Sequence, residues 1–251
     1  MKSQIALVVW LWMSCSGLAQ HAPAANDVTK LEQQLKEACL RHESADVSKH
    51  AVQLASITAY GPEMLEYALN LMESVEQNAL LITGGKGDTY PLITLQQVRA
   101  FRPDIQVIQA AWLEDPSFVQ WISQAYKVQG TPVEIVRQLS ATYPIYISLA
   151  APTIMIDALE QQLYCTGLAF KCSPNPIANV KGLYPNWWKN CSKNHLDSGY
   201  SLNANYLMPL ALLANYLAET SPKSVFLINT KREYATIAKS IGEKEQIPGM
   251  K

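Results

Sequence analysis

Residues 84–89 are the stretch whose residue types could do chemistry, because Gly-Gly-Lys-Gly-Asp-Thr joins three glycines to a cation and an acid. Glycine N–H groups can bind an anion, the lysine would add positive charge, and the carboxylate could hold a cation or act as an acid or base. The stretch lacks the GxxxxGK[ST] and GxGxxG patterns, so a nucleotide site is not supported. The candidate ligand-binding residues are Gly84, Gly85, Lys86, Gly87, Asp88 and Thr89.

The same residues also fit a structural turn, which is the favoured interpretation. The glycines would permit positive φ angles, and Asp88 or Thr89 would cap a helix that carries Pro91 in its first turn. If Asp88 is only a cap, Asp88→Asn should leave the fold nearly intact, because asparagine caps about as well. A ligand cradle stays open as the alternative.

Two further groups of residues were weighed as sites. Trp187 and Trp188, beside Tyr184, could form an aromatic platform for a sugar or a partner, but aromatic residues in such loops more often pack onto the core. His195 and Asp197 could share a proton, yet no nucleophile motif accompanies them, which favours a solvated pair. We therefore assign no catalytic residue, and we expect no metal and no cofactor.

Four cysteines follow the first twenty residues: Cys39, Cys165, Cys172 and Cys191. An even number in an exported chain permits disulfides. Cys172 and Cys191 flank a loop rich in proline, asparagine and tryptophan, and they are the pair we expect first.

The elements that must position these residues follow from apolar spacing and cap signals. Helical spacing covers 27–42 and 46–75, and strands are expected at 79–83, 105–110 and 145–149. Helices are expected at 91–100, 116–126 and 133–141, then a strand at 163–171 and a helix at 205–219 that Pro209 delays or kinks. This order predicts an α/β fold with a mostly parallel, Rossmann-like sheet, flanking helices and an N-terminal helical preface. The glycine-rich loop then lies at the carboxyl end of a strand, where such sheets bind ligands.

The first residues have the features of an export signal. Lys2 precedes an apolar run, and Gly17-Leu18-Ala19 resembles a cleavage site, so the mature chain is expected to begin at Gln20. A lipid anchor on Cys15 is the alternative. We expect residues 1–19 to be a signal peptide, 20–76 the helical preface, and 77–251 an α/β domain with C-terminal helices. The mature chain has no run long enough to span a membrane.

One longer segment resembles a known family. Residues 74–113, SVEQNALLITGGKGDTYPLITLQQVRAFRPDIQVIQAAWL, are similar to the soluble C-terminal part of multi-pass bacterial membrane proteins related to protein O-mannosyltransferases. Weaker similarity continues through 143–150, 163–174 and 203–219. In that family the glycosyl transfer belongs to a membrane half, so the resemblance does not imply transferase activity for these residues. Where the family has Gly-Asp-Asn-Asp, this chain keeps only the second acid, Asp88.

These observations predict an exported periplasmic or cell-envelope protein, and they favour a binding or accessory domain over an enzyme. Its expected partner is a glycan, a small ligand or an envelope protein. The net charge of −1 and the scattered cations speak against nucleic acid. The alternative is a hydrolase or transferase that uses the 84–88 loop on a carbohydrate or phosphorylated substrate.

Overall fold

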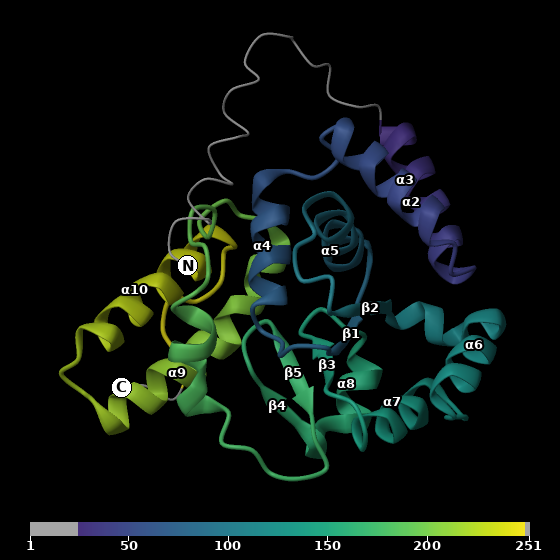
Figure 1. Ribbon diagram of the computed structural model, residues 1–251. Helices are drawn as coiled ribbons and strands as arrows, with labels where there is room; N and C mark the ends of the chain where they lie inside the picture. The colour runs from purple at the N-terminus through teal and green to yellow at the C-terminus, as the bar shows by residue number, and fades with distance from the viewer. Residues whose placement is uncertain (1–24, 249–251) are drawn as a thin grey trace, which may run out of the picture.

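The computed structural model describes residues 25–248 (Figure 1). The expected signal peptide, its cleavage site and Cys15 lie outside the described residues. The described part of the chain begins with three helices, α2 (Ala25–Leu40), α3 (Ser44–Ser56) and α4 (Pro62–Met72). The stretch 46–75, expected to be helical, is thus divided, because Pro62 takes the first position of a new helix and Gly61 precedes it as the N-cap.

A five-stranded sheet lies at the centre, in the order β2-β1-β3-β5-β4. Its strands are β1 (Leu80–Thr83), β2 (Gln106–Gln109), β3 (Ile145–Ser148), β4 (Leu163–Cys165) and β5 (Ala169–Cys172). The first strand pairs in parallel with β2 and β3, which confirms the three expected parallel neighbours.

The other half of the sheet differs from the expectation of a mostly parallel sheet. β5 is antiparallel to both β3 and β4. The stretch 163–171 was expected to be one strand, but Gly167 takes φ +141° and reverses the chain, so the stretch forms a hairpin. A short connection can only return a strand antiparallel, and the fold is therefore a mixed α/β sheet.

Among the helices between the strands, α6 and α7 begin where their cap residues predict. α5 (Lys86–Arg99) joins β1 to β2; η1 (Ala110–Glu114), α6 (Pro116–Tyr126) and α7 (Pro132–Ser140) join β2 to β3. Asp115 accepts hydrogen bonds from the N–H groups of Ser117 and Phe118, and Thr131 forms a capping box with Glu134. After β3 come α8 (Thr153–Leu159) and η2 (Glu160–Gln162).

The C-terminal part packs beside the sheet. It contains η3 (Val180–Gly182), a π-helical turn η4 (Leu183–Trp188), η5 (Ser201–Tyr206), α9 (Leu207–Thr220) and α10 (Val225–Ser240). Pro209 lies in the first turn of α9, which starts two residues later than the expected 205. Figure 1 shows α9 and α10 on the opposite side of the molecule from α6. None of the helices between residues 25 and 248 is long and apolar enough to cross a membrane.

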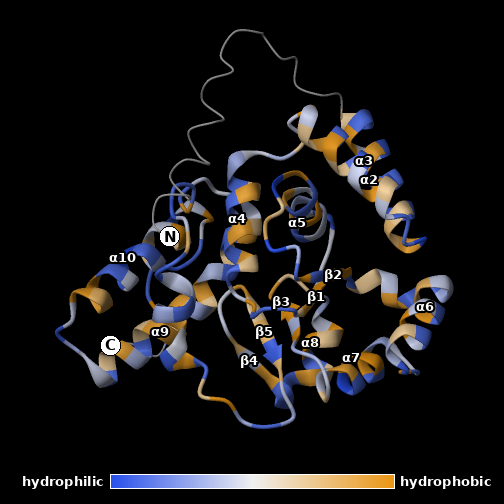
Figure 2. Cartoon of the chain, viewed as in Figure 1, coloured by the Kyte–Doolittle hydropathy of each residue, from blue (hydrophilic) through white to orange (hydrophobic). Residues whose placement is uncertain are grey.

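The core has two parts, one on each face of the sheet. Leu81 of β1 belongs to the part formed with α4, the 183–196 segment, α9 and α10, whereas Leu80 and Ile82 belong to the part formed with α6, α7 and α8. This division follows from the alternation of side chains along a strand. Figure 2 shows the apolar stripes of the helices turned toward the sheet.

Candidate functional site

The glycine-rich loop starts α5 earlier than the sequence predicts. The helix begins at Lys86 with Gly85 as its N-cap, so neither Asp88 nor Thr89 is the N-cap. Asp88 is instead the third helical residue, and its two carboxylate oxygens accept hydrogen bonds from the N–H groups of Gly84 (2.9 Å) and Gly85 (2.7 Å). Pro91 therefore lies inside the helix, where it cannot donate to the carbonyl of the residue four positions before it.

None of the three glycines adopts a positive φ angle, so the expected reason for their presence does not apply. A Cβ on Gly84 would lie 1.8 Å from the carbonyl oxygen of Ala150, so the loop needs glycine where it crosses the end of β3. A Cβ on Gly85 would meet nothing within 4 Å, and one on Gly87 would lie 3.2 Å from the hydroxyl of Tyr200.

Most of the polar groups of the candidate anion site already have partners within the protein. The donors of Gly84 and Gly85 already bind the carboxylate of Asp88, which is 1% exposed. Burial raises the pKa of Asp88, and the two glycine N–H groups oppose that rise. Lys86 forms an ion pair with Glu32 at 3.2 Å. Thr89 hydrogen-bonds Thr83 and the carbonyl of Gly85, so it too serves the loop itself.

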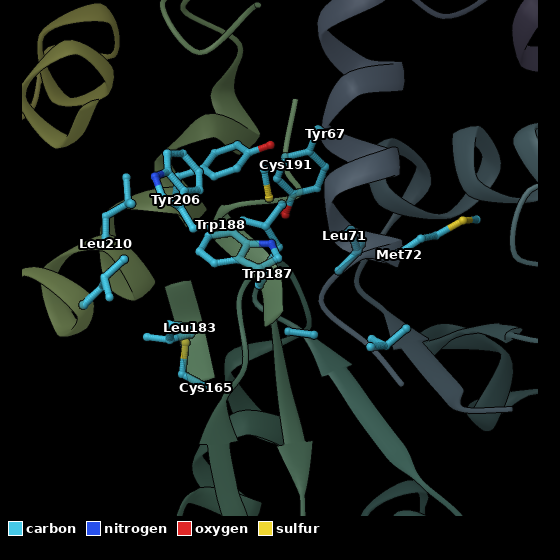
Figure 3. Close-up of a cluster of buried hydrophobic side chains, with 14 of the residues drawn as sticks. Tyr67, Leu71, Met72, Cys165, Leu183, Trp187, Trp188, Cys191, Tyr206 and Leu210 are labelled. Atoms are coloured by element: carbon cyan, nitrogen blue, oxygen red, sulfur yellow. The ribbon is translucent and has the colours of Figure 1, made fainter. Parts of the chain in front are cut away.

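The two tryptophans lie in the core (Figure 3). Trp187 is 1% and Trp188 2% exposed, and both rings pack against Tyr206. The indole N–H of Trp187 donates to the carbonyl of Asn70 (3.2 Å), and that of Trp188 to Glu233 (2.6 Å). Neither ring offers a face on which a sugar could stack.

The expected disulfide is absent, and all four cysteines of the described chain are free thiols. Cys172 lies in the core part that contains α6 to α8, and Cys191 in the part that contains α4 and α9. The sheet therefore separates the two thiols. The two cysteines flank one loop in the sequence, but β5 places Cys172 on the opposite face of the sheet from Cys191 before the loop begins.

A different polar centre forms around Glu66 of α4, which is 6% exposed. Its carboxylate accepts hydrogen bonds from the Ser192 hydroxyl (2.6 Å) and from the backbone N–H groups of Asn194 (3.0 Å) and His195 (2.9 Å). The ring Nδ1 of His195 lies 3.2 Å from the same carboxylate. The partner of His195 is thus Glu66, whereas the sequence suggested Asp197.

Asn70, one turn further along α4, fixes the same loop. Its amide donates to the carbonyl of Ser192 (2.8 Å) and accepts from the Ser192 N–H (2.9 Å). Glu66 and Asn70 lie four residues apart on a helix face that is otherwise buried. This spacing is the signal that the sequence offered for the site. Buried polar groups of this kind need partners, and here the 192–195 segment supplies them.

The 192–195 loop and α4 line an open cavity of about 420 Å³. We call it the α4 cavity; it is lined by Thr58, Tyr60, Gly61, Pro62, Leu65, Glu66, Leu69, Arg99, Ser192, Asn194 and His195. Of the residues singled out in the sequence, only His195 reaches it. Between residues 25 and 248 no three histidine, cysteine or acidic side chains gather as a metal site would require.

Comparison with protein families finds a match over part of the chain. Residues 64–142, from α4 through α7 and the two residues after it, match TMEM260-associated domain 2. This stretch is similar to that domain; TMEM260 is a protein O-mannosyltransferase-like protein, in line with the resemblance of residues 74–113. No curated protein and no solved structure matches the chain.

Proposed function

We propose that the chain is an exported, non-enzymatic binding domain that takes a small ligand in the α4 cavity. One observation carries the proposal: the Glu66 carboxylate binds three residues of the 192–195 segment, Ser192, Asn194 and His195, and holds His195 at the cavity. A wall fixed by buried hydrogen bonds is preformed, and preformed pockets lose little entropy when they bind.

The walls favour a ligand with an apolar body and one hydrogen-bonding end. Pro62, Leu65 and Leu69 supply apolar surface, while Asn194 and His195 supply polar groups. An ionised Glu66 can only accept, so the ring Nδ1 of His195 donates to it and leaves Nε2 of the neutral ring as an acceptor. Such an arrangement suits a small amphipathic molecule better than an extended glycan or a protein.

The family relation supports a domain role without transferase chemistry. We infer that the chain corresponds to the soluble C-terminal part of bacterial membrane proteins related to protein O-mannosyltransferases. The glycosyl transfer of such proteins belongs to membrane segments. The 84–88 loop is the other candidate site from the sequence, but its N–H donors are engaged by Asp88.

Hydrolysis at the α4 cavity is the second candidate function. A histidine oriented by a carboxylate is the arrangement of a general base, and Nε2 could activate water. The hydroxyl of Ser192, which lines the cavity, donates to Glu66 and so is not placed as a nucleophile activated by His195. We expect no turnover of nitrophenyl esters or phosphates; turnover that His195→Gln abolishes would favour the hydrolase instead.

Binding is tested with the amphipathic fluorophore anilinonaphthalene sulfonate and with decanoate and decanol as competitors. Leu69→Trp should fill the cavity and weaken binding at least tenfold, whereas Ile154→Trp, at a side chain 80% exposed on α8, should not. His195→Gln should weaken decanol more than decanoate, because only the hydroxyl of decanol can donate to Nε2. Equal binding by Leu69→Trp and the native chain would contradict the site.

Export is tested separately by mass spectrometry of the protein recovered from cells. We expect the mature chain to begin at Gln20. A diacylated Cys15 at the N-terminus would establish the lipid-anchored alternative, and an intact Met1 would contradict export.

A further inference from the structure

Next to the turn between α9 and α10 lies a set of exposed apolar side chains, none of which lines the α4 cavity. Val225 is 60%, Ile228 56% and Phe226 44% exposed, all in the first turn of α10. Figure 1 shows this turn at the edge of the molecule, away from the sheet. In Figure 2 the apolar start of α10 adjoins a hydrophilic turn. Three adjoining exposed apolar side chains at a protruding tip mark an interaction surface.

The tip is rigidly held from beneath. The Ser224 hydroxyl caps α10 by accepting from the N–H of Leu227 (3.3 Å), and the Ser224 N–H donates to Ser221 (3.0 Å). Leu227 is 6% and Thr230 1% exposed, so the inner face of the helix is buried while the outer face projects. The exposed apolar group is therefore a fixed feature of the fold.

The charges around the tip are predominantly positive. Lys223, Lys231 and Arg232 are exposed, and no acid lies between residues 221 and 232. Lys181 and Lys189 are exposed on the neighbouring segment, whose Tyr184 ring lies 4.6 Å from the Phe226 ring. The nearest acids along the chain are Glu219 at the end of α9, which is exposed, and Glu233, which is half-buried and accepts from Trp188.

We propose that this tip docks on the surface of an anionic lipid bilayer. Val225, Phe226 and Ile228 would enter the interface, and the cations, one turn behind or beside them, would meet the headgroups. The exposed N-terminus of α10 adds a partial positive charge in the same direction. Apolar side chains ringed by cations match an anionic membrane surface better than an acidic peptide, which would leave the apolar tip in water. The proposal is independent of the α4 cavity.

Flotation with lipid vesicles tests the proposal on the full mature chain. Vesicles of phosphatidylcholine with phosphatidylglycerol should carry the protein, and vesicles of phosphatidylcholine alone should carry much less. High salt should release the protein, because surface charges are screened. Val225→Ser with Ile228→Ser should weaken binding at least about tenfold. Lys223→Gln with Lys231→Gln should lower it about fivefold for each cation removed.

A matched control changes similar side chains elsewhere: Ile154→Ser on α8 with Lys127→Gln at the end of α6 should leave flotation unchanged. All variants alter exposed side chains, and thermal melts confirm that each is folded. Absence of flotation, or equal loss in the control, would overturn the proposal. Sedimentation velocity gives the remaining outcome: a dimer that Val225→Ser with Ile228→Ser dissociates would show that the tip binds a second copy instead of lipid.

Discussion

Gly84 and Gly85 are neighbours that should differ sharply in their tolerance of a side chain. A Cβ on Gly84 would overlap the backbone of Ala150, which cannot move without breaking the end of β3. Gly85 has extended backbone angles and open space around it. We expect Gly84→Ala to cost about 3 kcal/mol or more and Gly85→Ala at most about 1 kcal/mol, from a poorer N-cap. Urea unfolding of both variants compares them directly; equal costs would contradict the close approach.

Asp88 should be intolerant of asparagine, contrary to the expectation from a simple cap. Its two oxygens each accept from a different glycine N–H. Asparagine offers one oxygen, so its NH₂ group would face a backbone donor in a buried site. We expect Asp88→Asn and Asp88→Ala to lose similar stability, about 1–3 kcal/mol each. A melt of Asp88→Asn that overlaps the native curve would restore the cap interpretation.

At the scale of elements, the N-cap of α6 can be tested in isolation. The side chain of Asp115 accepts from Ser117 and Phe118, and these bonds lower its pKa. In urea unfolding, Asp115→Ala should therefore lower the midpoint, whereas Asp115→Asn should keep most of the stability. Glu114→Ala, at the preceding exposed acid, is the matched control and should have little effect. A loss at Glu114 as large as at Asp115 would mean that net charge, not capping, is responsible.

Arg102 ties the α4–β1 connection to the α5–β2 connection. Its guanidinium donates to the carbonyls of Met72, Val75 and Glu76 and forms a two-point bond with Asp104. The hydrogen bonds from Arg102 lower the pKa of Asp104 to about 2. Because the folded pKa lies below the unfolded value of about 3.9, this stabilisation is complete above pH 4 and is lost as the pH falls through 2.

We expect the pair of Arg102 and Asp104 to contribute about 1 kcal/mol to the free energy of unfolding, since the pair is partly exposed and screened. Asp104→Asn should thus be less stable than the native chain at pH 7, and the difference should close near pH 2. Urea unfolding across that range measures it. A difference that stays constant with pH would show that the charge of Asp104 is not involved.

At the scale of the whole molecule, local signals predicted the elements well and their distant contacts poorly. Asp115 and Thr131 act through neighbours within three residues, so their caps could be read from the sequence. The parallel group of β1, β2 and β3 followed from the alternation of strands and helices. The antiparallel β5 depended on one glycine reversing the chain, and an apolar run does not encode that turn.

The α4 cavity was not foreseen for the same reason. Glu66 meets residues that lie 126 to 129 positions away along the chain. Nothing in the spacing of either segment specifies that contact, and His195 has a nearer acid, Asp197, in sequence. Only the packing of the C-terminal part on α4 brings Glu66 and His195 together.

The matched segment 64–142 should not fold alone. It contains β1 and β2 but not β3, which pairs with the other edge of β1. It also lacks the core residues between positions 165 and 247, which complete the core around Leu81. A fragment that lacks so much of its core buries too little apolar surface to offset the conformational entropy of folding. We expect fragment 64–142 to lack a cooperative thermal transition and fragment 25–248 to show one, measured by circular dichroism. A cooperative melt of the short fragment would mean that the family-matched stretch is an independent domain.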